Sequence, residues 1–158
     1  MNIERLNQAI AIMKRAGTID MSFWQGETFD TCHTESELHS CGNSACFAGW
    51  VAISPEFVKV GGKHLPDSGA PIFNERMSHY AISEWLEAED ELHKEVIELL
   101  VIGEGAVLDS TVQWLESIGV KVEAVKHEPS SDYSYAHLEG WCMYEAQDVI
   151  KILEALRD

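Results

Sequence analysis

The sequence predicts a mainly α-helical fold: a single compact domain of five or six helices around a central apolar helix at about residues 44–53, with at most a small β element. Three observations lead to this prediction. Apolar residues recur at helical spacing in most segments. Hydrophobic residues make up 46% of the chain, and its 158 residues match the usual size of one domain. We therefore treat residues 1–158 as one globular domain.

The N-terminal third predicts two helices separated by a loop. The first helix follows from apolar residues on one helix face, namely Ile3, Leu6, Ile10 and Met13. Residues 18–40 lose this spacing and are expected to form a loop. The next segment, capped by Asn43 or Ser44 and ending at Ile53 before Pro55, is apolar nearly all round, which is typical of a helix at the centre of a fold.

Residues 55–74 contain three of the four prolines and two turn-forming pairs, Gly61-Gly62 and Ser68-Gly69. Proline and glycine at this density indicate turns. The segment is therefore interpreted as a surface insertion, with a short hairpin around residues 57–60.

The C-terminal half predicts four helices and one strand. Helices are expected at about 75–88, at about 91–102 and at about 144–157, with Asp90 as the cap of the second. A further helix is expected to begin with a capping box at 110–113 and to stop at Gly119. Residues 120–125 alternate like a half-buried strand, and the polar stretch 126–140 follows.

The charge of the chain favours some partners and excludes others. Eleven Lys and Arg face 27 Asp and Glu, which gives a formal net charge of −16. A field of this sign repels phosphate backbones and anionic lipid surfaces, so we expect no direct nucleic-acid or membrane binding and favour a protein partner with a basic surface. The N-terminus lacks the pattern of a signal peptide, and no apolar run is long enough to span a membrane. A cytoplasmic location is therefore expected.

Seven acidic residues cover the polar sides of the two helices expected at 75–88 and 91–102. They are Glu84, Glu87, Glu89, Asp90, Glu91, Glu95 and Glu98. Such a run is ordinarily a solvated face. Because few basic residues compensate it, it also predicts a protein-binding face that attracts a basic partner, and it could imitate the phosphates of DNA.

The densest group of potential metal ligands lies in residues 32–46. Cys32, His39, Cys41 and Cys46 are the candidate ligands, with His33 as a further one, and thiolate with imidazole is the donor set that zinc prefers. Cys41 and Cys46 have four residues between them, which is the loose end of the spacing seen in zinc sites. Two alternatives stay open: a reactive thiolate at Cys41, and plain packing with Cys46 as a small buried hydrophobe. No cofactor other than zinc is indicated.

One segment carries a family resemblance. Phe23-Trp24, followed by Cys41-Gly42-Asn43-Ser44-Ala45-Cys46-Phe47-Ala48-Gly49-Trp50, resembles small bacterial and bacteriophage proteins with a Cys-Gly-Thr-x-x-Cys-x-Ala-Gly-(His or Trp) segment. Asn43 stands where threonine is usual, and either residue can cap a helix. The resemblance implies the cytoplasm of a bacterium, or of its host cell if the chain is phage-encoded, and implies no reaction.

The sequence contains no nucleophile elbow, phosphate-binding loop or spaced acid pair, so no enzymatic activity is expected. The expected role is that of an acidic, non-enzymatic protein-binding protein. In its most specific form this is a phage-encoded modulator or DNA-mimic-like inhibitor of a host protein. The alternative is a zinc-binding or thiol-switch protein that uses the Cys and His residues of 32–46.

Overall fold

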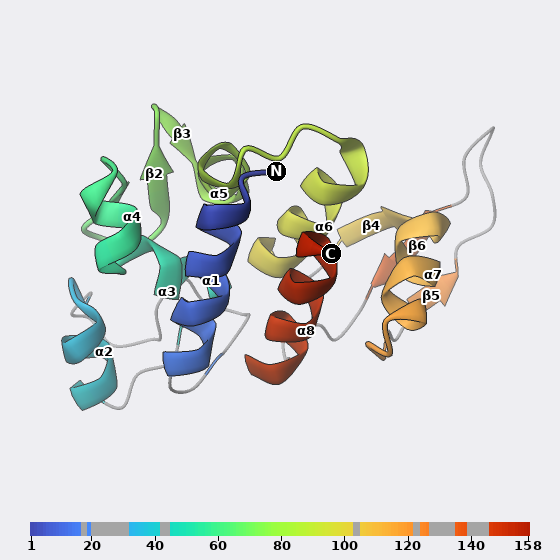
Figure 1. The fold of residues 1–158 in the computed structure, drawn as a ribbon, viewed down its shortest axis with the longest axis horizontal. Coiled ribbons are helices and arrows are strands. Elements are labelled where there is room, and N and C mark those ends of the chain that lie inside the picture. Colours follow the sequence, from blue (N-terminus) through green and yellow to red (C-terminus); the bar gives the residue numbers. More distant parts are fainter. Residues whose placement is uncertain are drawn as a thin grey trace.

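The computed structural model describes residues 1–16, 19, 32–41, 45–102, 105–121, 124–126, 135–138 and 146–158. Within them the chain is mostly helical, with eight helices and six short strands (Figure 1). The helices are α1 (Ile3–Arg15), α2 (Glu35–Cys41), α3 (Phe47–Ala52), α4 (Pro55–Lys59), α5 (Ser78–Leu86), α6 (Glu91–Ile102), α7 (Asp109–Ser117) and α8 (Ala146–Arg157). The strands are β1 (Lys63–His64), β2 (Pro71–Phe73), β3 (Arg76–Met77), β4 (Gly105–Leu108), β5 (Ala124–Lys126) and β6 (Tyr135–Leu138). The predicted fold class is confirmed. None of the described helices is long and apolar enough to cross a membrane.

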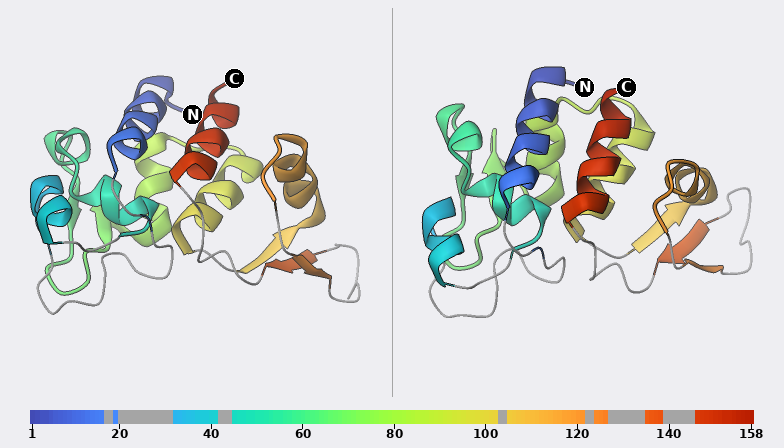
Figure 2. Two further views of the ribbon diagram at one scale, coloured as in Figure 1. Left: turned by 90° about the horizontal axis from the view of Figure 1, so that it is seen from below. Right: turned by 60° about the horizontal axis from the view of Figure 1, so that its bottom comes forward.

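The first and last helices, α1 and α8, lie side by side in all views (Figures 1 and 2). The N-terminus of α1 is capped by Asn2, whose Oδ1 accepts the backbone N–H of Arg5 at 3.1 Å. Both helices bury one apolar face, as their spacing predicts: Leu6, Ala9, Ile10, Ile12 and Met13 in α1, and Val149, Ile150, Ile152, Leu153 and Leu156 in α8. Only Ile3 departs from the predicted face of α1, since it lies 49% exposed at the first turn.

Helix α3 is the central element, and all six of its residues are buried. It contacts α1, α4, α5, α6 and β2, so the predicted central apolar helix is confirmed within shorter limits. Its cap differs from the prediction. Cys46, and not Asn43 or Ser44, is the N-cap, and its Sγ accepts the backbone N–H of Gly49 at 3.4 Å. A buried thiol therefore takes the place of the hydroxyl or amide that usually caps a helix.

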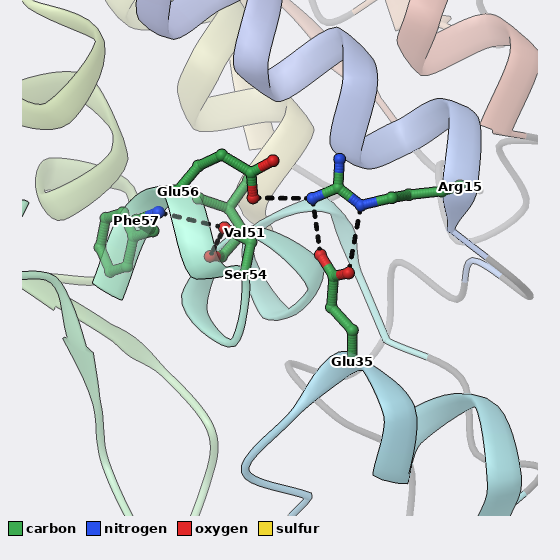
Figure 3. A network of polar contacts seen from close by, with 6 residues as sticks. All are labelled: Arg15, Glu35, Val51, Ser54, Glu56 and Phe57. Atoms are coloured by element: carbon green, nitrogen blue, oxygen red, sulfur yellow. Dashed lines mark hydrogen bonds and ion pairs between the residues drawn. The ribbon is translucent and has the colours of Figure 1, made fainter. Parts of the chain in front are cut away.

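Two short helices, α2 and α4, account for the difference between the eight helices described and the five or six predicted. Arg15 at the end of α1 joins both of them (Figure 3). Its guanidinium donates to Glu35 of α2 at 2.9 and 3.1 Å and to Glu56 of α4 at 2.7 Å. The hydrogen bond to Glu35 is the main cause that raises the pKa of Arg15, against the lowering effect of burial. Neither helix is long enough to show a helical repeat in the sequence.

Residues 55–59 form helix α4 and not the predicted hairpin. Ser54 caps the helix by accepting the backbone N–H of Phe57 at 3.3 Å, and Pro55 occupies the first turn, where its missing N–H is harmless (Figure 3). Gly61, at a φ of +98°, follows the helix and helps to end it. The backbone N–H of Gly61 donates to the carbonyl oxygen of Val58, and that of Gly62 donates to the carbonyl oxygen of Phe57. Local capping therefore overrides the β-branched residues that suggested a strand.

The 55–74 segment contributes to the core as well as to the surface. Strands β1, β2 and β3 form an antiparallel sheet in that order, and Asn74 and Glu75, both at positive φ, connect β2 to β3. Phe57 and Phe73 are 0% and 5% exposed, and their ring centroids lie 5.7 Å apart. The segment predicted as a surface insertion thus supplies two core aromatics.

The C-terminal half forms a second small sheet at one end of the molecule (Figures 1 and 2). Its antiparallel order is β4-β6-β5, so β6 lies inside the polar stretch 126–140 and β5 begins later than the predicted strand at 120–125. Helix α7 starts at Asp109, with Leu108 as an N-cap without a side-chain hydrogen bond, so the predicted capping box at 110–113 is wrong. Gly119, at a φ of +77°, follows α7, as predicted.

Candidate functional site

The candidate site lies where α5 is followed by α6. Helix α6 occupies the predicted range 91–102, whereas α5 begins at Ser78 because residues 76–77 belong to β3. Helix α5 ends at Leu86, and its C-cap Glu87 takes the left-handed conformation at a φ of +53°. The backbone N–H of Glu87 donates to the carbonyl oxygen of Glu84 at 3.2 Å, and that of Ala88 donates to the carbonyl oxygen of Ser83 at 3.0 Å. This is the usual hydrogen-bond pattern where a helix ends in a left-handed residue. The two helices then pack against each other.

The structure brings together six of the seven acidic residues predicted to form a binding face. They line one open depression with a volume of about 800 Å³. The acidic lining residues are Glu84, Glu87, Glu89, Glu91, Glu95 and Glu98. The other lining residues are Arg76, His79, Tyr80, Ser83, Ala88, Lys94 and Leu108. We call this region the acidic depression.

The acidic depression carries a strong local excess of negative charge. Six carboxylates face two cationic side chains, Arg76 and Lys94, which leaves a local charge of −4 with His79 counted as neutral. Like charges so close together repel one another, and a cation placed among them relieves that repulsion. The depression therefore favours cationic ligands.

Several of these carboxylates already contact groups of the chain itself. Glu87 forms an ion pair with Arg5 at 3.1 Å, and Asn2 Nδ2 donates to the same carboxylate oxygen at 3.2 Å. These contacts hold a glutamate in a left-handed conformation that suits glycine better. Glu84 accepts a hydrogen bond from the side chain of Asn74 at 3.3 Å.

Other carboxylates of the acidic depression remain accessible. Glu91 pairs with Lys94 at 3.0 Å, but its side chain is 88% exposed. Glu98 lies 3.9 Å from His79 Nε2, and its side chain is 53% exposed. Glu89 is exposed and has no ion pair or hydrogen bond with any residue that the structure describes. These three side chains can therefore meet a partner without first breaking a buried contact.

An aromatic pair stands beside the carboxylates. Tyr80 is 61% exposed, and its ring centroid lies 3.9 Å from that of His79. The sequence analysis did not assign either residue to the site. Helical spacing would have pointed to Tyr80, because it precedes Glu84 by four residues, which places both on one side of α5.

Glu95 lines the acidic depression, but its carboxylate has a structural task. One oxygen accepts the backbone N–H of Leu108 at 2.7 Å, and the other accepts the hydroxyl of Thr111, which is 1% exposed. Leu108 is the N-cap of α7 and provides no side-chain cap itself. Glu95 thus provides, from α6, an acceptor for the backbone N–H at the start of α7. In most helices a side chain of the first turn provides such an acceptor.

Removal of this carboxylate should destabilise the fold. Glu95→Ala leaves the Leu108 N–H and the buried Thr111 hydroxyl without their acceptor, so we expect a loss of about 1–3 kcal/mol in the free energy of unfolding. Glu98→Ala removes an equal charge from the same helix, and its effect should stay within about 0.5 kcal/mol. Urea unfolding of both variants checks this. Equal losses would show that charge, and not capping, accounts for the effect.

Asp90 is the one predicted contact residue that does not line the acidic depression. It caps α6, since its Oδ1 accepts the backbone N–H of His93 at 2.9 Å, and its second oxygen contacts His93 Nδ1. Its predicted role as the cap between the two helices is confirmed.

The candidate zinc ligands differ in their exposure to solvent. Cys32 and Cys46 are buried, and Cys46 caps α3. His39 is exposed, with its ring centroid 5.0 Å from that of Trp50, and the side chain of Cys41 lies outside the described residues. Across the described ranges, no group of three or more His, Cys, Asp or Glu is placed to hold a metal ion. Because the side chain of Cys41 is not covered, zinc binding stays a prediction.

Comparison with protein-family models, with curated proteins and with solved structures finds no match to this chain. The resemblance of residues 41–50 to the Cys-Gly-Thr-x-x-Cys-x-Ala-Gly segment stays a prediction, as does the bacterial or phage setting that it implies.

Proposed function

We propose that this chain is a non-enzymatic protein-binding protein that holds a basic partner in the acidic depression between α5 and α6. The observation that carries the proposal is the convergence of six carboxylates on one concave surface. In the sequence these residues are only a charge run. In the fold they surround a common volume large enough to receive side chains of a partner.

The charge of the whole chain supports the proposal. At a net charge of −16, the molecule attracts basic proteins from a distance and accelerates their encounter. The local charge of −4 then orients the partner toward the acidic depression. Because this attraction acts mainly on the association rate, binding should weaken steeply as the salt concentration rises.

The side chains at the rim support a cationic occupant. Glu89, Glu91 and Glu98 can accept hydrogen bonds from lysine or arginine, and these charge-assisted bonds are the strong ones at interfaces. The exposed ring of Tyr80 offers a face on which a guanidinium or ammonium group gains about 0.5–1 kcal/mol. We therefore expect a lysine- or arginine-rich segment of the partner to occupy the acidic depression.

The test compares two triple variants with equal charge loss. The first, Glu89→Gln with Glu91→Gln and Glu98→Gln, removes three charges from the acidic depression. The matched control, Glu4→Gln with Asp67→Asn and Glu116→Gln, removes three exposed charges that do not line it. Each chain is used as bait in host lysate at low salt, captured proteins are identified, and affinity for the purified partner is measured.

The two variants should differ clearly in affinity. Three exposed ion pairs, each contributing about 0.2–1 kcal/mol, predict a loss of about tenfold for the first variant. The control should bind within about twofold of the original chain, since it lacks those specific contacts. Capture of no basic partner by the original chain, or equal losses in the two variants, would contradict the proposal.

In its finer form the proposal makes the chain a phage-encoded modulator that imitates DNA and blocks a host DNA-binding protein. The support is the dense carboxylate array, which resembles a phosphate backbone in charge. Duplex DNA added to the purified complex should then release the partner in competition. A partner that binds duplex DNA and this chain at the same time would contradict the DNA-mimic form and leave only the general proposal of a protein-binding protein.

A further inference from the structure

Tyr80 presents an exposed aromatic ring to the acidic depression. The residue lines the depression and is 61% exposed. Its ring packs against that of His79, with the two ring centroids 3.9 Å apart and an angle of 41° between the planes. The His79 side chain is only 14% exposed. The Tyr80 ring is therefore held by a more buried neighbour and remains open to a ligand.

A carboxylate lies one helical turn away from that ring. Glu84 follows Tyr80 by four residues on α5, and residues at this spacing have Cβ atoms about 5–6 Å apart. The side chain of Asn74 donates to Glu84 Oε1 at 3.3 Å, which holds the carboxylate in place. Among the described residues, no group donates to its Oε2. An aromatic face and an acceptor oxygen therefore lie close together in the acidic depression.

The chain itself contains an example of how an aromatic ring and a carboxylate receive a cation together. The guanidinium of Arg5 lies over the ring of Phe73, at 5.6 Å from the ring centroid, and pairs with Glu87 at 3.1 Å. Its Nη1 also donates to the carbonyl oxygen of Trp85 at 2.7 Å. A planar guanidinium thus uses its face for the ring and its edge for the acceptors.

In the part of the chain that the structure describes, no cationic side chain stacks on Tyr80 in this way. Arg76 and Lys94 line the same depression, but the ring contact of Tyr80 is with His79. Lys94 already pairs with Glu91 at 3.0 Å. Because carboxylates outnumber cations in the depression, the arrangement favours a cation from outside the chain.

We infer that Tyr80 and Glu84 bind an arginine side chain of the partner and select it over lysine. The inference rests on the proposed function, because it names which basic side chain enters the acidic depression. Guanidinium is planar, weakly hydrated and donates through a fixed fork of N–H groups, so it can stack on the ring and bond to the carboxylate together. The ammonium group of lysine is a compact and strongly hydrated charge, so it gains less from the ring when it pairs with the carboxylate.

Two peptides of equal length and charge, one with arginine and one with lysine as its basic residue, test the inference. Their dissociation constants for the original chain and its variants are measured by calorimetry at low salt. Tyr80→Leu removes the aromatic face but keeps an apolar side chain, while Tyr80→Phe keeps the ring. Glu84→Gln removes the carboxylate, and its matched control, Glu4→Gln, removes an exposed charge that does not line the depression. All three positions are exposed, and urea unfolding establishes that each variant is folded.

The original chain should bind the arginine peptide about two- to fivefold more tightly than the lysine peptide, which corresponds to the strength of an exposed cation–π contact. Tyr80→Leu and Glu84→Gln should each remove most of this preference, whereas Tyr80→Phe and Glu4→Gln should keep it. Equal affinities of the original chain for the two peptides, or a preference that survives Tyr80→Leu or Glu84→Gln, would overturn the inference and leave the proposed function standing. Binding of neither peptide would overturn both, since the depression would then hold no basic side chain.

Discussion

Replacement of Trp50 by alanine is expected to lower the free energy of unfolding by about 3–5 kcal/mol. Trp50 is 1% exposed and lies in the middle of α3, which contacts α1, α4, α5, α6 and β2. Loss of the indole removes its apolar burial and leaves a cavity that a close-packed core cannot fill. Since whole domains are stable by only about 5–15 kcal/mol, the variant should be close to unfolding.

Urea unfolding measures this effect, and Val58→Ala is the control because Val58 is 50% exposed on α4. The control should change the free energy of unfolding by less than about 0.5 kcal/mol. A loss below about 1 kcal/mol for Trp50→Ala would mean that α3 is not the packing centre.

Replacement of Gly62 by alanine is the second change with a large expected effect. A Cβ atom at this position would lie 2.2 Å from Cδ1 of the Phe57 ring, and two further ring atoms would be within 2.6 Å. Phe57 is fully buried and contacts the rings of Phe73 and Trp85, so it has no free space into which to move. We expect a loss of about 1–3 kcal/mol or more from this overpacking.

A double-mutant cycle separates this clash from a change in the backbone. Phe57→Ala alone should cost about 3–5 kcal/mol, and it removes the ring that Cβ would strike. The double variant of Gly62→Ala with Phe57→Ala should then be about as stable as Phe57→Ala alone. Strictly additive losses in urea unfolding would show instead that the backbone at Gly62 requires glycine for its own sake.

The helices with a long apolar repeat could be predicted from the sequence. α1, α6 and α8 each have twelve or more residues, and their described bounds lie close to the predicted ones. α2 and α4 could not be predicted, because seven and five residues are too few to show a helical period. Their helical form depends on caps and on the Arg15 contacts, which involve residues far apart in the sequence.

The candidate site was predictable only in its charges. The run from Glu84 to Glu98 is visible in the sequence, and so is the capping role of Asp90, but the structural task of Glu95 is not. Glu95 reaches from α6 to the start of α7, which lies 13 residues further along the chain, whereas Asp90 caps its own helix α6 locally. The meeting of His33 with His64, whose Nδ1 and Nε2 atoms lie 2.9 Å apart, could not be predicted either, since it depends on how the segment before α2 packs beside β1.

The sequence by itself determined the helical class, the burial of the apolar segment around Trp50, and the strong negative charge of the chain. These follow from composition and periodicity, which act locally and need no knowledge of neighbours. The tertiary structure alone decided which carboxylates share a depression, that Glu95 supports the start of α7, and which histidines meet. The reason is physical: these contacts depend on distances between segments far apart in the sequence, and only packing of the whole chain sets those distances.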